Sequence, residues 1–96
     1  MPIFKMLDGE ELTTLSHMCG YATLAHGRIY DDRSIWLFED EGDGAESPTT
    51  VVQLDEAEKR LIIWDSYDPR ALTIELRESD REFLADLEAK YWPAEQ

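Results

Sequence analysis

The sequence predicts an α+β domain in which about five antiparallel strands form a sheet, with a short N-terminal helix and an amphipathic C-terminal helix packed on it. Short apolar, β-branched runs alternate with polar turns between residues 21 and 77, which is typical of consecutive hairpins. Residues 72–76 alternate apolar and polar side chains, as in a strand with one buried face. Near the C-terminus, apolar residues recur at the 3.6-residue period of a helix. A chain of 96 residues can bury one core, so residues 1–96 are expected to form a single acidic domain.

The N-terminal helix is predicted over residues 9–19. Asp8 can accept the backbone N–H of Glu11 while the Glu11 carboxylate reaches back, as in a capping box. Gly20 suits a left-handed C-terminal cap. From residue 21 the apolar period changes to two, which predicts a strand over residues 21–30.

The remaining strands are predicted from turn chemistry. Residues 34–38 follow the polar turn at 31–33 and pair with the preceding strand as a hairpin. Residues 49–54 and 60–64 form a second hairpin around a charged turn. After the turn that contains Pro69, the last strand covers residues 71–77.

The strand at residues 34–38 is apolar on both of its faces. Trp36 and Phe38 lie on one face, and Ile35 and Leu37 lie on the other. Buried strands usually read as continuous apolar runs, so we expect helices to cover both sheet faces. If one face is uncovered instead, its apolar surface predicts a homodimer or a partner interface.

The C-terminal helix is predicted from caps and periodicity together. Ser79 is the expected N-cap with Glu82 closing a capping box, and Pro93 ends the helix. On its surface, Asp86 and Lys90 are spaced for a weak i,i+4 ion pair.

Charge and composition exclude several classes of protein. Nine Lys and Arg against 22 Asp and Glu give a net charge of −13, which disfavours direct binding to nucleic acid or to anionic lipid. The sequence contains no apolar stretch long enough for a signal peptide or a membrane helix. A single cysteine, Cys19, excludes an internal disulfide. We therefore expect a cytoplasmic protein.

Candidate chemical groups do not match known catalytic or metal-binding spacings. His17, Cys19 and His26 match no zinc motif. Counted from Asp40, the acidic stretch at 39–48 lacks the Gly and Glu that an EF-hand needs at its sixth and twelfth positions, although a weaker cation site of other geometry stays open. Phosphate-binding, nucleophile-elbow and His-Glu-x-x-His motifs are absent. We expect no enzyme activity, no metal site and no cofactor.

The acidity instead predicts a basic protein partner. Rows of carboxylates on a rigid domain can imitate the charges of a nucleic acid and occupy the groove meant for it. We expect a small inhibitor that blocks the nucleic-acid-binding site of a basic, nucleic-acid-processing protein; in size and acidity it resembles phage-encoded anti-restriction and anti-CRISPR inhibitors. The expected partner-binding acids are Asp31, Asp32, Glu39, Asp40, Glu41, Asp43, Glu46, Asp55, Glu56, Glu58, Asp65 and Asp68. Tight binding also needs a central apolar anchor, for which Trp36, Phe38 and Trp64 are the candidates.

Two other functions fit the same acids. An immunity protein or antitoxin would cover the active site of one basic toxin. A salt-adapted domain, or a small enzyme with an unrecognised pocket, would carry its acids only as a solvated surface, and the low count of three lysines fits salt adaptation. A nucleic-acid mimic competes with DNA or RNA for its target, whereas an immunity protein neutralises one cognate enzyme.

Overall fold

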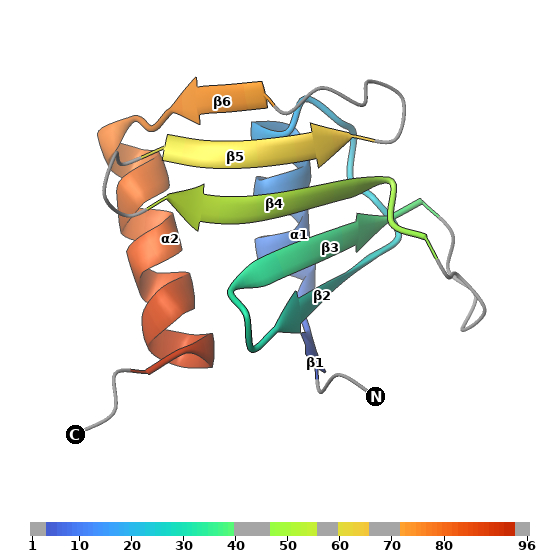
Figure 1. Ribbon diagram of the computed structural model, residues 1–96, viewed down its shortest axis with the longest axis horizontal. Helices are drawn as coiled ribbons and strands as arrows, with labels where there is room; N and C mark the ends of the chain where they lie inside the picture. Colours follow the sequence, from blue (N-terminus) through green and yellow to red (C-terminus); the bar gives the residue numbers. More distant parts are fainter. Residues whose placement is uncertain (1–3, 40–46, 56–59, 66–71, 94–96) are drawn as a thin grey trace.

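The computed structural model describes residues 4–39, 47–55, 60–65 and 72–93. Six strands and two helices lie within these ranges (Figure 1). In chain order they are β1 (Phe4–Met6), α1 (Gly9–Met18), β2 (His26–Tyr30), β3 (Ser34–Phe38), β4 (Thr50–Asp55), β5 (Arg60–Asp65), β6 (Leu72–Glu75) and α2 (Glu78–Tyr91). The predicted α+β class is confirmed, with six strands rather than five because β1 was not expected.

The strands form one antiparallel sheet in the order β1-β2-β3-β4-β5-β6, so each strand pairs with its neighbours in the chain. Both predicted hairpins are confirmed, with Arg28 opposite Trp36 in the first and Val51 opposite Trp64 in the second. The expected strand over 21–30 is wrong for residues 21–25, because the backbone of Tyr21 and Leu24 bonds to α1 instead, and β2 begins only at His26. The N–H of Tyr21 donates to the Ser16 carbonyl, and the N–H of Leu24 donates to Ser16 Oγ.

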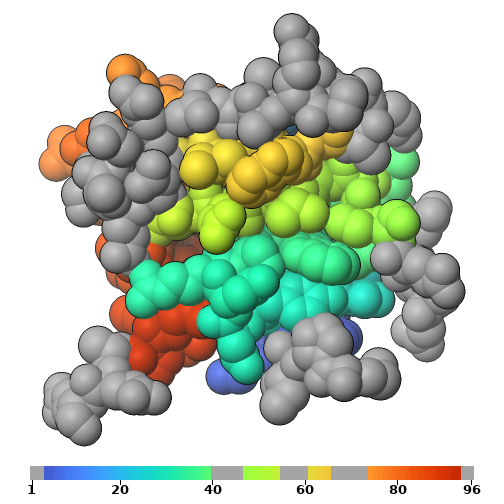
Figure 2. Space-filling model, in the orientation of Figure 1, coloured from blue at the N-terminus to red at the C-terminus, as the bar shows by residue number. Residues whose placement is uncertain are grey.

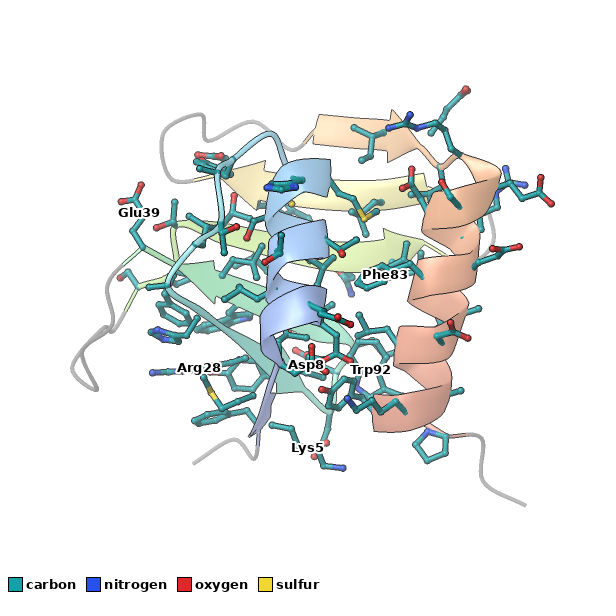
Figure 3. All side chains as sticks on the ribbon, turned by 180° about the vertical axis from the view of Figure 1, so that it is seen from behind. Lys5, Asp8, Arg28, Glu39, Phe83 and Trp92 are labelled. Atoms are coloured by element: carbon teal, nitrogen blue, oxygen red, sulfur yellow. The ribbon has the colours of Figure 1, made fainter. Side chains whose placement is uncertain are left out.

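Both helices lie on the same face of the sheet, as the front and back views show (Figures 1 and 3). The core lies between the two layers and consists of leucines from both helices together with the aliphatic side of the strands. Its members with at most 2% exposure are Leu15, Leu37, Val52, Leu61 and Leu87. Their packing defines the helix side of the sheet.

The expectation that helices cover both faces is therefore wrong. Six strands spaced about 4.8 Å apart form a sheet about 24 Å wide. A helix with its side chains is about 10 Å across, so two helices are needed to cover a single face. Neither described helix remains for the opposite face, which we call the open face.

The caps of α1 are those that the sequence predicts. The Glu11 N–H donates to Asp8 Oδ1 over 2.9 Å, and the Asp8 N–H donates to Glu11 Oε1 over 3.0 Å. Gly20 has a φ of +84°, the left-handed conformation expected after the helix end. Local sequence signals are sufficient to define this helix.

The caps of α2 differ from the prediction. The helix begins at Glu78, so Ser79 lies inside it, and the N-cap is Arg77. The Asp80 carboxylate accepts the Arg77 N–H at 3.3 Å, the kind of bond that Glu82 was expected to make with the Ser79 N–H two residues later.

The predicted ion pair between Asp86 and Lys90 is also wrong, because Lys90 turns toward α1. Its Nζ lies 3.3 Å from Asp8 Oδ2 and 3.0 Å from Glu11 Oε2. The Tyr91 hydroxyl donates to Glu11 Oε1 over 2.6 Å. Trp92 Nε1 donates to the Tyr30 carbonyl over 2.8 Å, so the end of α2 is fixed to both α1 and β2.

Candidate functional site

The open face carries one continuous row of large side chains across five strands. Because side chains alternate along a strand, residues opposite one another in the pairing register share a face. Met6 lies opposite Arg28, Arg28 opposite Trp36, Trp36 opposite Val51, and Val51 opposite Trp64. Figure 2 looks onto this face, where side chains of β2 to β5, coloured teal to yellow, occupy the centre.

Aromatic rings surround this row on β1, β2 and β3. Tyr30 lies between Phe4, at 5.5 Å between ring centroids, and Trp36, at 4.7 Å. His26 stacks on Phe38 at 4.5 Å with the ring planes 13° apart. Offset and edge contacts of this kind hold rings in fixed positions. The result is an aromatic platform in the β1–β3 half of the open face.

Part of the open face is exposed to solvent. Phe4 is 39% exposed, Met6 49% and Trp64 40%, and these three are the large apolar side chains most exposed among the described residues. All three lie on the open face, and Ile63, next to Trp64 on the helix side, is only 4% exposed. An apolar surface concentrated on one face is typical of an interaction site.

The two predicted tryptophan anchors are brought onto the same face, with Val51 between them in the register. Trp36 is half-buried, and its Nε1 donates to Ser34 Oγ over 3.2 Å. That bond fixes the orientation of the Trp36 ring, while Trp64 keeps more of its surface free. The third predicted anchor, Phe38, is 1% exposed beneath His26 and Arg28 and therefore supports the face without presenting its own ring.

Those predicted partner-binding acids that the structure describes lie at the ends of the strands rather than at the centre of the face. Asp31 and Asp32 are exposed in the turn between β2 and β3, and Glu39 is exposed at the other end of β3. Asp32 also shapes its turn, because its Oδ1 accepts the Ser34 N–H at 2.9 Å and the Ser34 hydroxyl at 2.5 Å. A strand of five residues separates the two acidic ends by about 17 Å.

Asp65 lies at the end of β5, on the helix side of the sheet. Its Oδ2 accepts hydrogen bonds from the Tyr21 hydroxyl and, at 3.2 Å, from the Thr50 hydroxyl. Partial burial raises the pKa of Tyr21 to about 12, and the hydrogen bond to Asp65 contributes to the same shift. Asp65 therefore fastens the 21–25 loop to the sheet, a role that the sequence did not indicate.

Of the other predicted acids, one lies in the sheet and seven lie outside the described residues. Asp55 is the last residue of β4, opposite Arg60 in the register. The residues outside the described ranges are Asp40, Glu41, Asp43, Glu46, Glu56, Glu58 and Asp68.

The His and Cys residues are separated by the fold. His17 is exposed on α1, Cys19 is the C-cap of α1, and His26 is in β2. Within the part of the chain that the structure describes, no three His, Cys, Asp or Glu side chains gather as metal ligands. Burial, with a smaller contribution from Asp65, raises the pKa of the Cys19 thiol to about 12, as for a structural cysteine.

Arg28, Phe4 and Met6 are the site residues that sequence reasoning missed. The Arg28 signal was present in the alternation of His26, Arg28 and Tyr30 along one strand. Phe4 and Met6 could not be found in the same way, because their place depends on the pairing of β1 with β2.

Among the described residues, no helix combines the length and the apolar composition that a membrane crossing requires. No protein-family model, curated protein or solved structure matches the chain.

Proposed function

We propose that this protein is a non-catalytic inhibitor that docks its open sheet face onto a basic, nucleic-acid-processing protein and occupies that protein's nucleic-acid-binding surface. One observation carries the proposal: an aromatic, partly exposed sheet face ends in carboxylates at both ends of its strands. Interfaces are strongest where aromatic anchors are desolvated at the centre, with charges at the rim guiding association.

The net charge of −13 supports a basic partner over a second copy of this chain. A second copy would bring the same charge to the interface, whereas Lys and Arg around an apolar patch would complement Asp31, Asp32 and Glu39. Proteins that bind nucleic acid carry such basic surfaces. The acids would then take the place of phosphates, and the tryptophans would supply the anchor.

The experiment is affinity capture from an extract of the cells in which the protein occurs, comparing the native chain with three variants. Trp64→Thr removes the exposed ring but keeps a β-branched residue in the strand. Asp31→Arg reverses one charge at the end of the open face, and Asp86→Arg makes the same reversal on the exposed surface of α2 as the matched control.

We expect Trp64→Thr to weaken binding of the captured protein at least about thirtyfold, as for a central hot spot. Asp31→Arg should slow association mainly at low salt, and Asp86→Arg should change neither quantity. In a second assay, the purified captured protein should lose its binding to DNA or RNA when one equivalent of inhibitor is added.

Other outcomes overturn parts of the proposal. A captured enzyme that does not bind nucleic acid would contradict mimicry and favour an immunity protein or antitoxin. Equal capture by all four chains would contradict docking by the open face. A chain that captures nothing would favour a salt-adapted surface.

A further inference from the structure

Arg28 lies in the middle of β2 and places a positive charge among the rings of the aromatic platform (labelled in Figure 3). Its guanidinium carbon lies 4.8 Å from the centroid of the Phe4 ring and 4.5 Å from that of the Phe38 ring. Both distances are within the range of cation–π attraction. Two rings therefore hold the guanidinium in place on the open face.

In the described chain, no carboxylate pairs with this guanidinium, although the sequence contains 22 acids. Other described cations do have carboxylate partners: Lys90 contacts Asp8 and Glu11, and Arg33 lies 3.9 Å from Glu88. Arg28 is half-buried, and the contacts found for its guanidinium are those with the rings. Its N–H donors therefore have no acceptor among the described residues.

A partner that covers the open face would take water away from these donors. A guanidinium loses strong hydration when it is buried, and it needs hydrogen-bonded acceptors in exchange. The described residues supply no such acceptor, whereas a docked partner would bring its own. A carboxylate fits best, because it accepts two parallel N–H bonds from the guanidinium and neutralises its charge.

We infer that Arg28 binds a carboxylate of the docked partner, so that the partner's footprint is a basic surface with one acidic side chain near its centre. This inference rests on the proposed function, and it specifies the partner beyond charge alone. A phosphate of a nucleic acid would present a similar acceptor, but a polyanion would have to approach a protein of net charge −13. A single carboxylate within a basic surface meets no such repulsion.

The test uses the purified protein and small probes, so it does not depend on capture of a partner. Benzoate combines a carboxylate with a ring that can stack on the platform, and benzamide is its uncharged counterpart. Binding is followed by the NMR signals of the Arg28 side-chain N–H and the tryptophan indole N–H groups. The comparison variants are Arg28→Gln, Arg28→Lys, and Arg81→Gln as a matched control on the exposed surface of α2.

We expect benzoate to shift the Arg28 and indole signals with a midpoint at least about tenfold lower than that of benzamide, because charged hydrogen bonds are stronger than neutral ones. Arg28→Gln should abolish this preference, Arg28→Lys should reduce it because the bidentate fork is lost, and Arg81→Gln should leave it intact. The comparison of benzoate with benzamide on the native protein stands even if a variant does not fold.

Three results would overturn the inference: no shift with benzoate, equal midpoints for benzoate and benzamide, or an inorganic phosphate midpoint as low as that of benzoate. The third result would assign Arg28 to phosphate groups. None of them contradicts docking by the open face, which the capture experiment tests separately. Conversely, failed capture with a clear benzoate preference would leave a carboxylate site without the proposed inhibitor function.

Discussion

Two adjacent isoleucines in β5 test whether the sheet is covered on one face only. Ile63 is 4% exposed on the helix side, and Ile62 is half-buried on the open face. Replacing either with alanine removes the same side-chain carbons. Any difference in the free energy of unfolding therefore reports the surroundings rather than the chemistry of the substitution.

The expected difference follows from burial. Each buried CH₂ stabilises by about 0.8 kcal/mol, so Ile63→Ala removes about 2.4 kcal/mol of transfer free energy. Unfilled space between the sheet and the helices raises the cost to about 3 kcal/mol. At Ile62 the side chain already contacts water, which can fill the vacated space, so Ile62→Ala costs about 1 kcal/mol.

The assay is urea unfolding followed by far-UV circular dichroism. With an m-value of about 1.5 kcal/mol/M, Ile63→Ala lowers the midpoint by about 2 M and Ile62→Ala by about 0.7 M. If Ile63→Ala does not fold, the milder Ile63→Val and Ile62→Val pair should keep the same order. Equal losses at the two positions would refute the one-sided architecture. A midpoint that rises with protein concentration would show that a second copy covers the open face.

Three further predictions concern the helix side. Ser16 is fully buried, and its hydroxyl donates to the Leu12 carbonyl and accepts the Leu24 N–H. Ser16→Ala should therefore lower the free energy of unfolding by about 2 kcal/mol. Thr14→Ala, which removes a bond at a less buried site, should lower it by less than about 0.5 kcal/mol, both measured by urea unfolding. The raised pKa of Cys19, about 12 against 9.0, lowers its thiolate fraction about a thousandfold, so iodoacetamide should react at least about tenfold more slowly than with the urea-unfolded chain. The hydrogen bond from the Glu11 N–H holds the folded-state pKa of Asp8 below 3.8. The stabilisation by the Asp8 carboxylate is therefore present above pH 3.8 and is lost as the pH falls through the folded-state pKa. Asp8→Asn should lower the urea midpoint at neutral pH, and the difference from the native chain should disappear in strong acid.

Features of the fold that depend on neighbouring residues could be predicted from the sequence. The capping box of Asp8 and Glu11, the left-handed Gly20 and the two hairpins each depend on residues a few positions apart. The start of α2 shows the limit of such signals. Ser79 could cap the helix itself, and Asp80 can accept the N–H of a residue three positions earlier. The helix begins at Glu78 after Arg77, so it is Asp80 that caps it.

Features that depend on distant residues could not be predicted. β1 has three residues, too few for a periodic signal, and its place is set by pairing with β2. Coverage of one face follows from comparing sheet width with helix number, which requires the complete strand order. The row that joins Trp36 to Trp64 through Val51 depends on two registers at once. The sequence pointed to Trp36 and Trp64 as candidate anchors but not to the arrangement that places them on one surface.

The charge and the open face predict opposite effects of salt on two equilibria. An exposed aromatic face favours self-association, and carboxylates at the strand ends on a chain of net charge −13 oppose it. The same carboxylates would attract the proposed basic partner. Salt at physiological strength screens exposed charges beyond about 8 Å, and higher concentrations screen them more strongly while strengthening apolar contacts. Sedimentation equilibrium should therefore show more dimer as salt rises, while affinity for the captured partner falls. If both equilibria move in the same direction, the acids do not select between a second copy and a basic partner.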